Sequence, residues 1–132
     1  MANIIRSKDT LGNEVCPNFK VDSGINSKTV VNPRMAMAHV TLSPGERNQF
    51  HYHVKCDAGN YILKGNLRYS FGPEFQRKVF DVGPGDFIYV PRGEIHSAMN
   101  LSNTEPAELI SCYNEVGSRE EAQTIFLEPP IS

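Results

Sequence analysis

Short runs of apolar or alternating apolar and polar residues recur along most of the chain, and turn residues separate them. In such a run every second side chain points to the same face, which is typical of a half-buried β-strand rather than of a helix. Many short strands at even spacing favour an antiparallel sandwich or barrel. The pattern predicts strands at residues 35–42, 48–54, 60–64, 67–71, 78–82, 86–90, 95–99 and 108–113.

The breaks between these strands carry residues that favour tight turns. Gly65-Asn66, between two apolar runs, is typical of a two-residue hairpin. One helix is predicted after Ser118, because Ser118 and Glu121 have the spacing of a capping box. We expect it to last only about two turns, since the strand-like sequence TIFL follows closely. The charged run at 119–121 is interpreted as its exposed start.

Length and composition favour one all-β domain that fills the whole chain, 1–132. A chain of 132 residues with 39% hydrophobic and 21% charged positions is typical of a globular protein with a single core. Ten glycines and nine prolines disfavour long helices. We expect N-terminal strands and an arm in residues 1–34, a barrel in residues 35–115, and the short C-terminal helix with a tail in residues 116–132.

Charge and hydropathy exclude several classes of partner. Thirteen basic residues face fifteen acidic ones, without a basic stripe, which disfavours a nucleic-acid ligand. No apolar run approaches the roughly 20 residues of a membrane span, and the one near the N-terminus is too short for a secretory signal. Three cysteines without a paired spacing are expected to be free thiols. We therefore expect a cytoplasmic protein that binds neither nucleic acid nor membrane.

The histidines form the one constellation with clear chemical meaning. His51 and His53 are two residues apart in a predicted strand, so both imidazoles point to one face. His96 begins a later strand, and a folded sheet can bring it opposite the pair. Three neutral imidazoles suit a divalent transition metal, whereas a lone histidine, such as His39 in the opposite register, is usually a surface or hydrogen-bonded residue.

The histidines lie in two blocks with characteristic spacing. Residues 45–65 read G-ERNQF-HYH-VKCD-A-GNYILK-G, and residues 85–100 read G-DFIYV-PRG-EI-H-SAM-N. Both blocks resemble the paired motifs of the cupin superfamily, in the expected order. The resemblance implies a jelly-roll β-barrel, also described as a double-stranded β-helix, with a metal near one mouth. It implies that His51, His53 and His96 are the metal ligands. It also assigns turn and packing roles to Gly45, Gly65, Gly85, Pro91, Gly93 and Asn100.

The first block departs from the family at one position. The usual fourth ligand is a glutamate, and its place is taken by Ala58, which cannot coordinate a metal. The adjacent Asp57 faces away from the site by strand alternation unless a β-bulge shifts the register. Asn60 and Gln49 are the other inward candidates, either as weak ligands or as residues that hold a water on the metal.

The missing carboxylate points to a class of substrate. An ion held by three neutral ligands keeps its +2 charge, which favours anionic chelating ligands and leaves open positions for a substrate and O₂. The ligand set is similar to that of three-histidine cupins such as β-diketone-cleaving and thiol dioxygenases. We therefore expect a metal-dependent, dioxygenase-type enzyme for a small anionic or enolisable substrate, with Tyr69 and Tyr89 as candidate pocket residues.

Several alternatives stay open at this point. Fe²⁺ is the preferred metal, with Ni²⁺, Zn²⁺, Cu²⁺ and Mn²⁺ as alternatives. Because one fold hosts many functions, a non-catalytic sugar- or metabolite-binding sensor and a metal-dependent isomerase or lyase are the alternative functions. A small barrel leaves sheet edges that a second subunit can cover, so we also expect a homodimer.

Overall fold

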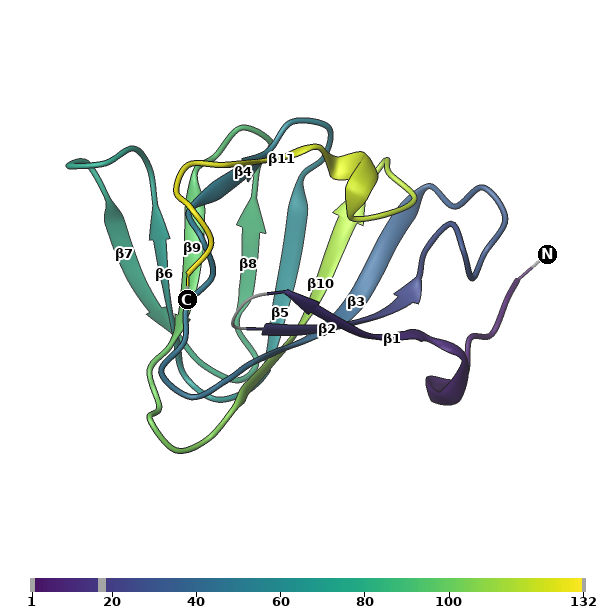
Figure 1. Ribbon diagram of the computed structural model, residues 1–132, viewed down its shortest axis with the longest axis horizontal. Helices are drawn as coiled ribbons and strands as arrows, with labels where there is room; N and C mark the ends of the chain where they lie inside the picture. Colours follow the sequence, from purple (N-terminus) through teal and green to yellow (C-terminus); the bar gives the residue numbers. More distant parts are fainter. Residues whose placement is uncertain (1, 17–18, 132) are drawn as a thin grey trace.

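The chain folds into two facing antiparallel sheets with a jelly-roll arrangement (Figure 1). The structure is a computed structural model that describes residues 2–16 and 19–131. The six-stranded sheet has the order β1 (Leu11–Cys16), β2 (Phe19–Ile25), β3 (Met35–Leu42), β10 (Ala107–Asn114), β5 (Ala58–Lys64) and β8 (Phe87–Val90). The five-stranded sheet has the order β11 (Thr124–Phe126), β4 (His51–His53), β9 (His96–Asn100), β6 (Leu67–Phe71) and β7 (Lys78–Val82). A single turn of 3₁₀ helix, η1, lies at Ser7–Asp9.

The alternating pattern predicted eight of these strands, β3 to β10, with one clear exception. β3, β6 and β7 have the predicted bounds, but the strand predicted at 48–54 is confined to β4. Asn48 explains the difference, because its side-chain Oδ1 accepts hydrogen bonds from the Ala98 N–H and the Ser97 hydroxyl, at 2.9 and 3.1 Å. A side chain thus replaces part of the backbone pairing with β9.

The predicted C-terminal helix is shorter than expected. It is a single 3₁₀ turn, η2, at Glu120–Ala122. The cap itself is present, since the hydroxyl of Ser118 accepts a hydrogen bond from the Glu121 N–H at 3.1 Å. Gln123 then takes a left-handed conformation, with φ of 51°, and the chain continues as β11 beside β4 (Figure 1). Strand pairing at the rim of the barrel therefore ends the helix after one turn.

The core lies between the two sheets and is built from alternate positions of the strands. In β3 the inward residues are Ala36, Ala38, Val40 and Leu42, and the strands of the other sheet add larger side chains such as Leu67. Burying one such aliphatic side chain stabilises the fold by about 1.5–3 kcal/mol. One hydrophobic cluster includes residues of both sheets, so the sheets are held by a shared core.

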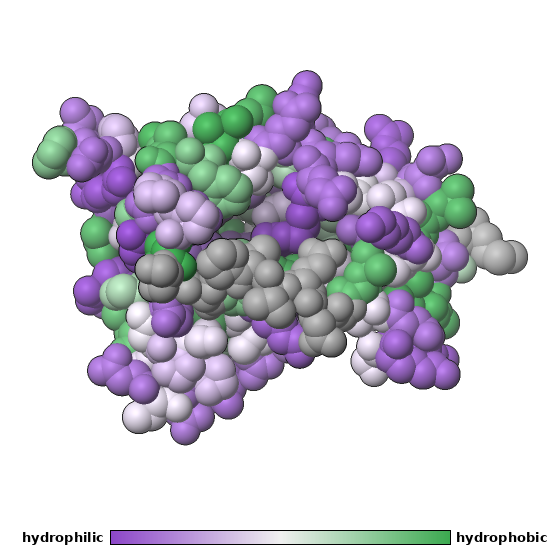
Figure 2. Space-filling view, in the orientation of Figure 1, coloured by the Kyte–Doolittle hydropathy of each residue, from purple (hydrophilic) through white to green (hydrophobic). Residues whose placement is uncertain are grey.

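Outward positions carry polar residues and several exposed apolar ones. His39 lies on the outer face, where its Nε2 is 2.8 Å from Glu108 Oε1, as expected for a surface histidine. Tyr89 was expected in the pocket, but it is 67% exposed, because the alternation of β8 points Ile88 and Val90 inward instead. Figure 2 shows hydrophobic and hydrophilic residues intermingled over the visible face.

Two motif residues have structural roles. Gly65 has a φ of +89°, and a Cβ there would lie 2.9 Å from the Cβ of Ala107, so both conformation and space require glycine. Asn100 is 2% exposed, and its amide group donates to the backbone carbonyl of Glu105 at 2.8 Å and accepts from the Ser102 N–H at 3.0 Å. It fixes the loop that leads from β9 towards β10.

Two further observations concern the described part of the chain. Cys56 and Cys112 are free thiols, while the side chain of Cys16 lies outside the described residues. Within residues 2–16 and 19–131, no helix is long and apolar enough to cross a membrane.

Candidate metal centre

The three motif histidines meet at one point between the sheets. His51 and His53 come from β4, and His96 comes from β9, directly opposite His51 in the strand register. Their candidate ligand nitrogens all lie within 4.8 Å of one another, and all three residues are buried. The ring centroids of His51 and His96 are 4.2 Å apart. The structure therefore brings together the three residues that the sequence placed in the site.

Hydrogen bonds fix which nitrogen each ring presents. The Nδ1 of His51 lies 2.6 Å from the backbone carbonyl of Gln49, and the Nδ1 of His96 lies 2.9 Å from that of Glu94. A carbonyl only accepts, so in both rings the proton is on Nδ1 and the lone pair is on Nε2. The Nδ1 of His53 is 2.9 Å from the hydroxyl of Thr124, and this hydrogen bond orients the third ring. Histidines that bind metals usually have their other ring nitrogen held by such a hydrogen bond.

Burial also keeps the rings in the neutral form that a metal requires. Burial, with a smaller contribution from the neighbouring imidazoles, lowers the pKa of His51 and of His53 from 6.5 to about 3. Burial likewise lowers the pKa of His96. At pH 7 the three rings are therefore uncharged donors, so the donor set fits a divalent transition metal.

The hydrogen bond to Thr124 gives a testable prediction. Replacing Thr124 with valine keeps the shape of the side chain but leaves the Nδ1 of His53 without its acceptor. We expect metal affinity to fall about 10–100-fold, as for other residues that orient metal-binding histidines. Thr124→Ser keeps the hydroxyl and is expected to bind metal as the wild type does. Competition with a chromogenic chelator measures both, and equal affinities for the two variants would contradict this role.

Asp57 does not join the histidines. Its Oδ1 accepts hydrogen bonds from the Arg92 backbone N–H at 2.9 Å and from Arg92 Nε at 3.1 Å, and its Oδ2 accepts one from Asn114. The Arg92 guanidinium holds the pKa of this carboxyl well below its usual range. The register of β5 is regular over its first residues, Ala58–Tyr61, so no bulge there turns Asp57 inward. Ala58 is buried and lines the same cavity as the histidines.

Asn60 and Tyr69 face that cavity as a hydrogen-bonded pair. The side-chain amide of Asn60 donates to the Tyr69 hydroxyl at 3.0 Å, and the Asn60 Oδ1 is buried without a partner among the described residues. Burial raises the pKa of Tyr69 to about 12, so the hydroxyl stays protonated. Gln49 instead uses its side-chain amide to bind the carbonyl of Glu128 at 2.8 Å. Its side chain lines a second, larger cavity and not the one that contains Asn60 and Tyr69.

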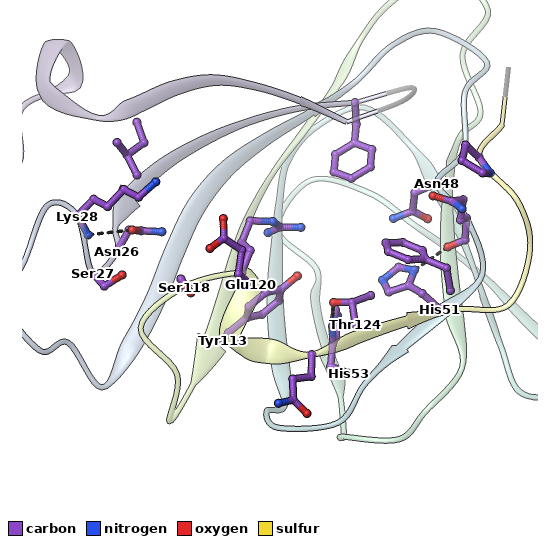
Figure 3. A pocket seen from close by; sticks show the side chains of 17 residues that line it. Asn26, Ser27, Lys28, Asn48, His51, His53, Tyr113, Ser118, Glu120 and Thr124 are labelled. Atoms are coloured by element: carbon purple, nitrogen blue, oxygen red, sulfur yellow. Dashed lines mark hydrogen bonds between the residues drawn. The ribbon is translucent and has the colours of Figure 1, made fainter.

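Two cavities that share lining residues, among them His51 and His53, surround the site. The inner one is about 40 Å³ and is lined by the three histidines together with Ala58, Asn60 and Tyr69, among others. It has room for an ion or a water but not for an organic molecule. The outer one is about 690 Å³, within the range of small-molecule pockets. Figure 3 shows His51 and His53 on one side of the outer cavity, Lys28 on the other and Tyr113 between them.

Arg119 and Tyr113 are the site residues that the sequence did not indicate. Both line the inner and the outer cavity, and the Arg119 guanidinium carbon lies 5.0 Å from the centroid of the Tyr113 ring. The sequence interpretation assigned Arg119 to an exposed helix start. It lies beyond both motifs, and no local pattern marks it, because only the path of the C-terminal segment across the barrel brings it to the histidines.

Comparison with known proteins agrees with this fold. A family model described as a cupin domain matches residues 38–113. Germin-like protein subfamily 2 member 4 of Arabidopsis thaliana is 29% identical over 127 residues, which cover 92% of this chain and 55% of the relative. Oxalate decarboxylase OxdC of Bacillus subtilis is 31% identical over 98 residues, which cover 74% of this chain and 24% of the relative.

A solved structure is similar over nearly the whole chain. It is that of the same Bacillus subtilis decarboxylase, from a study of its Mn(II) centers, with a TM-score of 0.72 and 23% identity. The match covers 96% of this chain and 34% of the solved one. The chain thus spans about half the length of the germin-like relative and about a quarter of that of the decarboxylase.

Proposed function

This chain belongs to the cupin family, and from that premise we propose that it is a metal-dependent enzyme of the dioxygenase type for a small anionic or enolisable substrate. The observation that carries the proposal is the set of three buried, neutral histidines, each with Nε2 free, beside a cavity of about 690 Å³. Among the described residues this cluster contains no carboxylate, so a bound ion keeps its full charge for an anionic ligand.

His51, His53 and His96 would hold the metal, with Fe²⁺ or Mn²⁺ as the proposed ions. The sequence favoured Fe²⁺, and the Mn(II) centers named for the related decarboxylase support Mn²⁺ as well. When bound, the ion would supply Lewis-acid and redox chemistry for an anionic oxygen ligand and dioxygen. Ni²⁺, Zn²⁺ and Cu²⁺ are the alternatives that elemental analysis of the natively purified protein distinguishes.

The polar side chains of the inner cavity would orient the one oxygen atom that a substrate held in the outer cavity extends into it. Because the oxygen of Tyr69 accepts a hydrogen bond from Asn60, its own proton is available for an anionic oxygen in the cavity. The free Asn60 Oδ1 accepts from a protonated group of the substrate or from a water. The apolar lining, which includes Leu42, Val40 and Leu109, limits access of bulk water to this end of the cavity.

Oxygen uptake tests the proposal. Protein loaded with Fe²⁺ or Mn²⁺ is mixed with oxalate, pentane-2,4-dione and related enols and carboxylates, and O₂ consumption is followed with metal-free protein as the control. We expect uptake that depends on both metal and substrate. Ligand-induced thermal stabilisation without turnover would favour the binding-module alternative, and turnover without O₂ would favour an isomerase or lyase. Absence of a transition metal from the native protein, with no stabilisation by added metal, would overturn the metal centre.

The homodimer and the cytoplasmic location expected from the sequence stay predictions. The homodimer is supported by Phe87 and Tyr89, which are exposed on β8 at the edge of the six-stranded sheet.

A further inference from the structure

Arg119 is the only arginine, lysine, aspartate or glutamate among the described residues that line the inner cavity. It also lines the outer cavity, so it stands where the two cavities meet. A ligand in the outer cavity can therefore contact this guanidinium together with His51 and His53, which also line both cavities.

This guanidinium has no carboxylate partner within the described part of the chain. Arg68 pairs with Asp81 and Arg92 pairs with Asp57 and Glu115, but none of the ion pairs of the described residues includes Arg119. A half-buried cation beside a cation-binding site is unfavourable unless an anion lies between them.

The backbone around Arg119 is held firmly on two sides. On one side the carbonyl of Gly117 accepts a hydrogen bond from the Ser27 N–H at 2.7 Å. On the other side the carbonyl of Ala122 accepts from the N–H groups of Val54 and Lys55, at 3.2 and 3.1 Å. The ring of Tyr113 lies beneath the guanidinium. The side chain is thus partly ordered before a ligand arrives, which lowers the entropic cost of binding.

We propose that Arg119 is the anion-recognising residue of this site and that it pairs with a carboxylate of the substrate in the outer cavity. The planar guanidinium fork matches a carboxylate through two parallel hydrogen bonds. The remaining oxygen atoms of the substrate then face the three histidines. The substrate class is accordingly narrowed to small carboxylates with a second oxygen donor, such as dicarboxylates and 2-oxo or 2-hydroxy acids. This inference rests on the proposed metal-dependent function.

Ligand binding to cobalt-loaded protein tests this assignment without relying on turnover. The visible Co²⁺ spectrum is titrated with oxalate as the anionic probe and with imidazole as the neutral one, and elemental analysis establishes the metal content first. For Arg119→Met we expect the Kd for oxalate to rise about 10–100-fold, the loss expected for charge-assisted hydrogen bonds, while the Kd for imidazole stays unchanged. Arg119→Lys keeps the positive charge but lacks the planar guanidinium. We expect its Kd for oxalate to lie between that of the wild type and that of Arg119→Met.

Arg68→Met is the matched control, because Arg68 pairs with Asp81, lines neither cavity and should leave oxalate binding nearly unchanged. If metal-loaded Arg119→Met binds oxalate as tightly as the wild type does, the role of Arg119 is overturned and the metal centre is not. Equal weakening of oxalate and imidazole would also overturn it, since it indicates a structural role. Failure of the wild-type protein to bind Co²⁺ would instead overturn the metal centre, and the assignment with it.

Discussion

Replacing His96 with alanine abolishes metal binding, and replacing His39 with alanine leaves it intact. His96 is the one ligand from β9 and lies opposite His51, so its loss leaves only the two imidazoles of β4. The two remaining imidazoles come from one strand and leave the ion without its third ligand, so we expect no measurable binding. His39 is the matched control because it is a histidine on the outer face, paired with Glu108.

Metal-dependent thermal stability is the measurement for this pair of variants. A metal at about 100 times its Kd stabilises the native state by about 2.7 kcal/mol, or a rise of roughly 10 °C in Tm for a chain of this size. We expect that rise for the wild type and for His39→Ala, and none for His96→Ala. The metal-free His96→Ala protein should remain folded, since the substitution removes a buried polar ring. A normal metal-induced rise in His96→Ala would contradict the three-histidine site.

Placing glutamate at position 58 makes stability depend strongly on metal. Ala58 is 3% exposed and lines the cavity that contains the three histidines. Without metal, a carboxylate there is buried without a partner and should destabilise the fold by about 3 kcal/mol. With metal, the carboxylate gains a direct charge partner, so we expect this deficit to disappear and metal affinity to rise.

The neutral variant Ala58→Gln separates charge from size. It adds nearly the same volume, and we expect its stability to be much less sensitive to metal than that of Ala58→Glu. Thermal unfolding of both variants with and without Fe²⁺ or Zn²⁺ measures the effect. Oxalate should also bind the metal-loaded glutamate variant more weakly than the wild type, because the charge of the site falls from +2 to +1. Equal destabilisation of Ala58→Glu with and without metal would show that position 58 does not reach the ion.

The strands and the histidine cluster could be predicted because their signals are local. A period of two residues marks an inward and an outward face, so β3, β6 and β7 have the predicted bounds. The same period puts His51 and His53 on one face, and both are buried. The pattern failed where side chains compete with the backbone, as Asn48 does beside β4. It also misplaced Tyr89, because the short β8 has aromatic residues on its outer face.

The sequence by itself determined that the chain forms short strands and that three histidines meet at a site without the usual glutamate. Only the tertiary structure decided what surrounds that site. Arg119 reaches the cavity through hydrogen bonds that tie its segment to Ser27 and to Val54, both far away in the chain. Such long-range contacts have no counterpart in local periodicity, because they depend on how the two sheets close over one another.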